Sequence, residues 1–465
     1  MMERDIFASL NPFDHRYYAS NPSLFAQLSE YFSENAYIRY ELKVEAALAR
    51  VLAKRGICST EIADEIERAC NEVQPEEVYL EEEITKHNIR ALVNCIQRRV
   101  SDGAKPYVHF TTTSVDIMDS ATAMRFKEAT EQLVLPKCLE LESILIEIAR
   151  REKDTVQVGR THGQHAVPIT FGFAMAEYVT RFGSRIQAIK ATASNLRGKI
   201  AGAVGAYNAS NLFFDDPMEF ETEVLWELGL KPAMYSNQIV EPEYITDYIH
   251  AIVSAMGVLA NLADDIRHLQ RTEIGEVGEV FEAHQVGSST MPHKRNPWNF
   301  EHIKSLWKTV MPRMMTLYMD QISEHQRDLT NSASGRFVPE IVVGFVAAVD
   351  RMTRVLKKLV VDQERMKRNF DSTKEMVIAE PMYILLASLG HPNAHEAVRL
   401  LTLESQQTGK TLRELLVEKT ELYPYWEKLN PKQREILENP EKYIGWASKK
   451  TEILCDYWEK QLFIQ

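Results

Sequence analysis

The run of residues 287–297 carries the side chains with the clearest chemical potential in this sequence. It reads Gly-Ser-Ser-Thr-Met-Pro-His-Lys-Arg-Asn-Pro, so two hydroxyls, an ammonium and a carboxamide share one short loop. Removing a proton beside a carboxylate places charge on the carboxylate oxygens, and Lys294 and Asn296 are donors that can stabilise this charge. The base must reach the proton, which makes Ser288 or Ser289 the candidate if Lys294 activates the hydroxyl. The same composition is also ordinary for a solvated turn.

Two histidines in residues 159–168, Gly-Arg-Thr-His-Gly-Gln-His-Ala-Val-Pro, are candidates for a general acid. Histidine suits this role because its unperturbed pKa is about 6.5, close to neutral pH. His162 and His165 could instead satisfy backbone groups in a turn, or bind a metal as a pair. A metal is the weaker interpretation, because no further ligands with a suitable spacing accompany them.

Residues 109–119, His-Phe-Thr-Thr-Thr-Ser-Val-Asp-Ile-Met-Asp, place several hydroxyls at the start of a predicted helix. Hydroxyls and free backbone amides converge at such a start, which therefore suits an anion. Thr113 and Ser114 are the candidate ligands, although the cluster could equally be only a helix N-cap.

Long helices are expected to position these blocks. Glycine and proline number 19 and 18 in 465 residues, so few residues interrupt the chain. Apolar side chains recur at intervals of three and four between residues 252 and 269, and again between 139 and 149, as on one face of a helix. No strand-like alternation of comparable length is present. The sequence therefore predicts an all-α protein with a long central helical bundle.

Two loop-like segments, 102–106 and 379–381, divide the chain. We predict an N-terminal helical domain at residues 1–110, a central domain of long helices at 111–365 and a C-terminal helical domain at 366–465. A chain of this length can bury a large core.

Charge and cysteine usage limit the class of protein. The formal charge of −12 disfavours nucleic-acid binding. The five cysteines are widely spaced and include no Cys-x-x-Cys pair, unlike a disulfide framework or a zinc site. The N-terminus has no apolar core of a signal peptide, and the longest apolar run, 341–349, is far shorter than the roughly 18 residues of a membrane span. We expect a soluble cytoplasmic protein with no nucleic-acid or membrane partner.

The first block resembles the signature of the fumarase/aspartase superfamily of lyases, Gly-Ser-Ser-x-Met-Pro-x-Lys-x-Asn-Pro, at every fixed position. The resemblance implies that Ser288 is the general base, while Lys294 and Asn296 bind the carboxylate that becomes part of fumarate. It also implies the three-part superfamily fold, in which four subunits build a twenty-helix core. A homotetramer with shared active sites, and without a cofactor or a metal, is therefore expected.

The second block is similar to the Arg-Thr-His-Gly-Gln form of the adenylosuccinate lyase family within that superfamily. The similarity makes His162 the general acid and Glu301 its carboxylate partner, which would raise the pKa of the histidine and orient its ring. Glu301 could otherwise be a solvated acid at a helix start. In these lyases, the residues at the positions of Thr113 and Ser114 bind a substrate carboxylate.

Other segments resemble the nucleotide-binding positions of the same family. A guanidinium beside a phenol, as in Arg16-Tyr17, suits a phosphate. Asn88 stands where the family has an acid, and His302 stands where an asparagine is expected. The resemblance assigns substrate binding to Arg16, Tyr17, Lys86, His87, Asn88, Thr113, Ser114, Gln238, Ser289, Arg327, Ser332 and Arg336.

The resemblance covers nearly the whole chain and implies a carbon–nitrogen lyase of purine biosynthesis. Ser288 would take a proton from the succinyl carbon and His162 would protonate the departing nitrogen. Fumarate would leave adenylosuccinate, giving AMP, and would also leave the succinylaminoimidazole carboxamide ribotide. Two alternatives stay open: another superfamily enzyme, of the carboxymuconate cycloisomerase type, and a catalytically silent structural relative.

Overall fold

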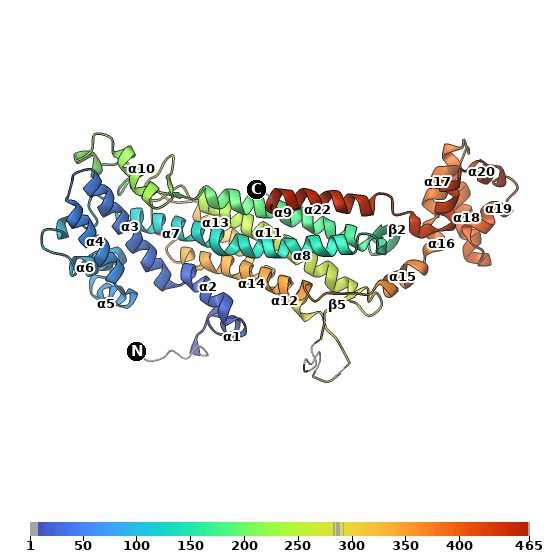
Figure 1. Ribbon diagram of the computed structural model, residues 1–465, viewed down its shortest axis with the longest axis horizontal. Coiled ribbons are helices and arrows are strands. Elements are labelled where there is room, and N and C mark those ends of the chain that lie inside the picture. The colour runs from blue at the N-terminus through green and yellow to red at the C-terminus, as the bar shows by residue number, and fades with distance from the viewer. Residues whose placement is uncertain (1–7, 282–283, 285–288, 292, 464–465) are drawn as a thin grey trace. The chain divides into compact units, whose positions relative to one another are not determined.

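The computed structural model describes residues 8–281, 284, 289–291 and 293–463, and it confirms a mainly helical fold (Figure 1). The α-helices are α1 Tyr18–Ser20, α2 Pro22–Phe32, α3 Glu34–Lys54, α4 Thr60–Glu72, α5 Pro75–Thr85, α6 Asn88–Gln97, α7 Ser114–Ala129, α8 Leu135–Arg151, α9 Phe171–Ser194, α10 Pro217–Glu227, α11 Glu243–Leu269, α12 Trp298–Val310, α13 Arg313–Asp320, α14 Val338–Leu356, α15 Gln363–Asp371, α16 Lys374–Val377, α17 Ala379–Ser388, α18 Ala394–Thr408, α19 Leu412–Glu418, α20 Tyr423–Lys428, α21 Pro431–Glu438 and α22 Ala447–Phe463.

Short helical turns and strands connect these helices. The turns are η2 Phe13–Tyr17, η3 Lys105–Tyr107, η4 Thr130–Val134, η5 Ser210–Leu212, η6 Ser334–Phe337 and η7 Pro440–Lys442. The strands are the antiparallel hairpin of β1 Val156–Thr161 and β2 Gln164–Thr170, the parallel pair β3 Arg197–Gly198 and β4 Lys231–Pro232, and the antiparallel pair β5 Val277–Gly278 and β6 Val360–Val361.

The two helical patterns in the sequence are confirmed. Residues 252–269 form the second part of α11, and residues 139–149 lie within α8. The predicted break at 379–381 falls where α17 begins directly after α16, with Pro381 in the first turn of α17, a position where proline is tolerated.

The chain divides into two compact units. Unit 1 comprises Met1–Cys138, Arg185–Gly257 and Leu306–Val349, and unit 2 comprises Leu139–Ser184, Val258–Ser305 and Asp350–Gln465. Each unit has its own buried apolar side chains.

In unit 1, α3 supplies much of the core and packs against α4 and α7. Ser33 caps α3 by accepting a hydrogen bond of 3.1 Å from the amide of Ala36. Alanine and branched side chains such as Val44 and Leu48 are fully or almost fully buried along the helix, which allows the neighbouring helices to approach closely.

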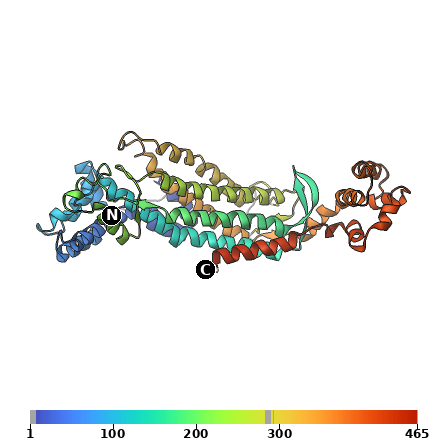
Figure 2. The ribbon, with the colours of Figure 1, turned by 90° about the horizontal axis from the view of Figure 1, so that it is seen from above.

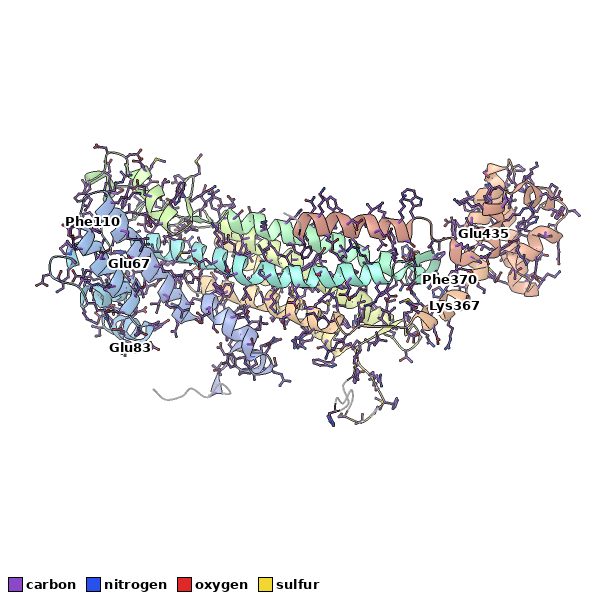
Figure 3. All side chains as sticks on the ribbon, viewed as in Figure 1. Glu67, Glu83, Phe110, Lys367, Phe370 and Glu435 are labelled. Carbon is purple, nitrogen blue, oxygen red and sulfur yellow. The ribbon has the colours of Figure 1, made fainter. Side chains whose placement is uncertain are left out.

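In unit 2, the helices α17 to α21 share an apolar core, visible in Figure 1 as the orange-to-red cluster of short helices that carries the labels α17 to α20. Its centre includes Met382, Leu412 and Leu415, each at most 1% exposed. The β1–β2 hairpin belongs to the same unit and is seen as paired teal arrows in Figure 2. Val158 of this hairpin packs against Phe370 of α15, which is labelled in Figure 3.

Helix α11 is long and apolar enough to cross a membrane, with 27 residues and a mean hydropathy of 1.3 over its most apolar window. However, 67% of that window is buried against the rest of the chain. We therefore interpret α11 as a core helix, since apolar side chains already covered by protein need no lipid.

Glu41 on α3 is a carboxyl group in the core of unit 1, and it is 3% exposed. Its Oε1 atom has no hydrogen-bond partner among the described residues. Burial, reinforced by the charge of Glu34 and opposed by Arg125, raises the pKa of Glu41 to about 8. The side chain is therefore neutral in the folded protein at pH 7.

This raised pKa predicts a pH-dependent loss of stability. Because the folded-state pKa exceeds the unfolded value near 4.5, the contribution of Glu41 is complete below that value and is lost as the pH rises toward 8. Glu41→Gln should abolish the loss, so its unfolding free energy relative to the wild type should rise by about 1.4 kcal/mol per pH unit between about pH 5.5 and 7.5.

Urea unfolding at several pH values, at one protein concentration, measures this difference. Glu83→Gln is the control, because Glu83 is an exposed glutamate on α5 (Figure 3). Parallel stability curves for the wild type and Glu41→Gln would contradict a neutral Glu41.

Candidate active site

The start of α7 holds Thr113 and Ser114 as the sequence predicts. Thr113 is the N-cap and forms a capping box with Asp116, whose Oδ2 accepts a hydrogen bond of 2.8 Å from the Thr113 amide. Asp116 is fully buried and also pairs with the equally buried Lys199 ammonium. This ion pair ties the start of α7 to the segment around β3, so the position of Ser114 is fixed by buried contacts.

A cavity of about 410 Å³ in unit 1 brings two predicted substrate residues together. Ser114 and His87 both line it, from the starts of α7 and α6. The His87 ring also caps α6, because its Nδ1 accepts a hydrogen bond of 3.3 Å from the Arg90 amide. Nδ1 is thereby occupied, which leaves Nε2 as the other polar atom of the ring.

His109 lines the same cavity and has no role in the sequence-based prediction. Its Nδ1 lies 2.7 Å from Oε1 of Glu45, a carboxylate that is 1% exposed. Burial acts to lower the pKa of His109, but the Glu45 carboxylate outweighs this effect and holds the pKa above its usual value. Arg90 also lines the cavity, and its guanidinium is a group that suits an anionic ligand. The sequence offered one signal for this residue, since His109 is the first residue of the 109–119 block. Its partner Glu45 is 64 residues away along the chain, so the pair could not be predicted from that block.

Gln238 and Arg327 are also brought together in unit 1. The Gln238 amide donates a hydrogen bond of 3.1 Å to the carbonyl of Gln326, the residue before Arg327. Arg327 has the unusual backbone angle φ of 134°, and its Nη2 atom is buried without a hydrogen-bond partner among the described residues. A buried, unsatisfied guanidinium nitrogen is costly unless a ligand supplies the acceptor.

Asp119 lies one and a half turns along α7 from Ser114 and adjoins the Gln238 segment. Its Oδ2 accepts a hydrogen bond of 2.8 Å from the Val240 amide. Burial raises the pKa of Asp119 to about 6, although this hydrogen bond and the charges of Lys199 and Arg327 act to lower it. The α7 helix thus carries contacts to both groups of predicted substrate residues in unit 1.

The remaining predicted substrate residues of unit 1 are mostly exposed. Arg16, Lys86, Ser332 and Arg336 are open to solvent, and Tyr17 and Asn88 are half-buried. The Tyr17 ring packs against Phe13 and Phe25, which gives it a structural contact. The Asn88 amide faces α7, with Nδ2 at 3.6 Å from the sulfur of Met118.

In unit 2, the signature loop leads into α12. Ser288, the predicted base, lies outside the described residues. Ser289 and Lys294 are exposed, and Asn296 is half-buried. Glu301 lies in the first turn of α12, where its charge suits the positive end of the helix.

His162 is at the tip of the β1–β2 hairpin. It forms a two-residue turn with Gly163, and both have a positive φ, of 54° and 73°. This pattern is that of a type I′ turn, which normally favours Asn-Gly. A β-bulge lies between Val158 and Arg160, and a Cβ atom at Gly159 would come within 2.4 Å of the Val167 carbonyl oxygen, so glycine is needed there.

The His162 ring and the Glu301 carboxylate are both exposed, and no hydrogen bond or ion pair joins them within the described part of one chain. The second histidine of the block, His165, has a partner instead: its Nδ1 lies 2.9 Å from the Thr373 hydroxyl. Among the described residues, no group of three or more His, Cys, Asp or Glu side chains is placed to hold a metal ion.

Comparison with known proteins identifies the class of enzyme to which this chain belongs. The sequence model of a lyase family matches residues 15–311, more than half of the chain. The fold is also similar to two solved structures. One is a 3-carboxy-cis,cis-muconate lactonizing enzyme from Pseudomonas putida, with a TM-score of 0.79 and 25% identity over 93% of this chain and 97% of the other. The second is a fumarate lyase from Mesorhizobium sp. BNC1, with a TM-score of 0.81 and 24% identity over the same shares of the two chains. The chain is therefore a member of this lyase class.

A second match identifies the family within the class. The sequence model described as adenylosuccinate lyase C-terminal matches residues 323–444. The chain is 37% identical to the adenylosuccinate lyase of Pyrococcus abyssi, over 97% of this chain and 98% of the relative, and 34% identical to that of Methanocaldococcus jannaschii, over 94% of each. The chain belongs to the adenylosuccinate lyase family.

Proposed function

We propose that this chain removes fumarate from adenylosuccinate by β-elimination and leaves AMP. The observation that carries the proposal is the 37% identity to an adenylosuccinate lyase over nearly the whole of both chains. The same chemistry extends to the succinylaminoimidazole carboxamide ribotide, because both substrates carry a succinyl group on nitrogen and a ribose phosphate. Neither a cofactor nor a metal takes part in the proposed reaction.

The proposed elimination needs a base, an acid and a site for the developing charge. Ser288 takes the proton from the succinyl carbon, and Lys294 and Asn296 stabilise the charge that spreads into the adjacent carboxylate. His162 donates a proton to the departing nitrogen, so the leaving group departs as a neutral amine. Glu301 orients the His162 ring and favours its charged form.

The nucleotide part of the substrate is proposed to bind to the residues gathered on unit 1. Ser114, His87 and His109 line a cavity together with Arg90, whose guanidinium suits an anionic group. The buried Nη2 of Arg327 offers a further donor to a phosphate or carboxylate oxygen. The other residues assigned to substrate binding in this proposal are Ser289, which belongs to unit 2, and Arg16, Tyr17, Lys86, Asn88, Thr113, Gln238, Ser332 and Arg336 of unit 1.

We further propose a cytoplasmic homotetramer with the three-part division at residues 1–110, 111–365 and 366–465. Large apolar side chains are exposed at intervals of three and four along and beyond α13 in the single chain, including Met315, Met319 and Ile322 at 60%, 62% and 78%. Such a stripe supports burial against other subunits, because a monomer seldom exposes it to water.

The direct test is to mix the purified protein with adenylosuccinate and to follow the ultraviolet absorbance as AMP and fumarate form. The likeness to a muconate lactonizing enzyme makes 3-carboxy-cis,cis-muconate the substrate for the alternative. Activity on the muconate alone would replace the proposal with a cycloisomerase. Activity on none of adenylosuccinate, the succinylaminoimidazole carboxamide ribotide and the muconate would favour a structural relative.

A further inference from the structure

Glu276, beside β5 in unit 2, holds a fully buried carboxylate whose acceptor capacity is filled by the protein itself. It accepts hydrogen bonds from four nitrogens: Nη1 and Nη2 of Arg160, Nε2 of Gln157 and Nδ2 of Asn369. The distances for Arg160 Nη1, Gln157 and Asn369 are 3.1, 2.7 and 2.8 Å. A carboxylate has about four lone-pair sites, so this group is saturated and has no free site for a ligand.

These donors come from separate segments, which Glu276 joins. Gln157 and Arg160 belong to β1, whereas Asn369 belongs to α15 and also donates to the carbonyl of Ile274 at 2.8 Å. The backbone carbonyl of Glu276 accepts from the Asp362 amide at 2.9 Å. The carboxylate therefore anchors one strand of the hairpin to a packed part of unit 2.

Arg160 is the last residue of β1 whose side chain is anchored inward. Its side chain is 18% exposed, whereas the residues from 161 to 165 are all exposed. Arg160 pairs in register with His165, so the next residues, Thr161 and Gln164, flank the turn at His162. The bidentate Arg160–Glu276 pair is thus the nearest buried anchor to that turn, beside the exposed contact between His165 and Thr373.

The turn itself needs such an anchor. His162 has a φ of 54°, a conformation that costs a non-glycine residue free energy and persists only where the surroundings hold it. A two-residue loop also transmits any shift of its strands directly to the residue at its tip. A displacement of about 1 Å at a reacting group can reduce a rate by as much as about a hundredfold.

We propose that Glu276 is a positioning residue that acts through Arg160 to hold the hairpin tip, and with it the ring of His162, in its working orientation. The proposal rests on the proposed function, in which His162 is the general acid. Because Glu276 is fully buried and protein donors fill its acceptor sites, we expect its effect to be on the chemical step rather than on substrate binding.

The test uses Glu276→Gln in the full-length protein. The carboxamide keeps the shape of the carboxylate, but an NH2 group replaces one of its oxygens and faces the N–H donors that this oxygen accepted from. The change also leaves Arg160 without a counter-charge. We expect kcat on adenylosuccinate to fall by about tenfold while KM changes by less than about threefold. Amide hydrogen exchange of residues 156–170, followed by mass spectrometry, should become faster.

A double-variant comparison separates positioning from a general structural role. If Glu276 acts through His162, Glu276→Gln added to His162→Asn should lower kcat no further than His162→Asn alone. Multiplied losses would overturn the inference, because they would show that Glu276 acts elsewhere. Unchanged kcat together with unchanged hydrogen exchange in Glu276→Gln would also overturn it.

Glu152→Gln is the matched control. Glu152 is a buried carboxylate of the same unit that accepts from Arg151, Thr155 and Gln363, and it lies before the base of the hairpin. We expect this variant to retain kcat within about threefold. An equal loss in both variants would overturn a specific role for Glu276 near the tip.

A second variant keeps the test decisive if Glu276→Gln does not fold. Arg160→Lys preserves the charge but loses the bidentate contact. We expect it to lower kcat by less than Glu276→Gln does, and to make amide hydrogen exchange in the hairpin faster than in the wild type. A normal kcat with normal exchange in Arg160→Lys would contradict the inference. If the wild type has no activity on adenylosuccinate, the proposed function fails, while the exchange measurements still decide whether Glu276 holds the hairpin.

Discussion

Replacement of Ser288 by alanine should lower kcat on adenylosuccinate by at least about a hundredfold, the lower end of what general base catalysis contributes. The reason is that the elimination begins with removal of a proton from the succinyl carbon, and no hydroxyl would remain at the position that the superfamily signature assigns to the base. Substrate binding should persist, because Lys294 and Asn296, which we propose to bind the carboxylate, are unchanged. Initial rates and a binding isotherm for the variant measure both quantities.

Ser289→Ala is the matched control, since Ser289 is the neighbouring hydroxyl of the same loop. We expect it to lose far less activity than Ser288→Ala, with its main effect on KM as a substrate-binding residue. If Ser289→Ala is the inactive variant and Ser288→Ala turns over normally, the base has been assigned to the wrong serine. If both variants are active, neither serine of the loop is the base.

Long helices could be predicted from the sequence because their apolar side chains repeat over many turns. The pattern at residues 252–269 extends through most of α11, and tertiary packing reinforces it, since this face is buried. The β1–β2 hairpin was not predicted. Its strands have only six and seven residues, and His162-Gly163 is not one of the usual turn pairs.

The helix-start cluster was predictable because capping is local. Thr113 and Asp116 are three residues apart, so one short segment of sequence contains both residues of the capping box of α7. The ion pair between Asp116 and Lys199 joins residues 83 positions apart, and nothing in either segment indicates the other. Buried partners of this kind depend on the packing of the whole unit.

The same limit explains why the environment of each candidate residue was harder to predict than its identity. His109 could be read from the 109–119 block, but its raised pKa depends on Glu45 of α3. His162 was singled out by its motif, whereas the anchor at Glu276 lies 116 residues beyond Arg160. Motifs therefore indicated the chemical groups, and the fold supplied the contacts that orient and charge them.

Mixing two severely impaired variants should restore activity if each site takes its blocks from different subunits. His162→Asn removes the proposed acid, and Ser288→Ala removes the proposed base. In mixed tetramers formed from equal amounts, about a quarter of the sites would receive an intact copy of both residues, so activity should recover to about a quarter of the wild-type value. In one chain, His162 and Glu301 are exposed and form no hydrogen bond or ion pair with each other within the described residues, as expected if their partners lie on other subunits.

Subunit exchange must be shown independently, for example by isolating tetramers that carry two different affinity tags. Each variant incubated alone under the same conditions is the control, and neither should gain activity. Mixed tetramers without recovered activity would mean that Ser288 and His162 of one site come from the same chain. Recovery without mixed tetramers would also contradict shared sites, because no site could then have combined residues of the two chains.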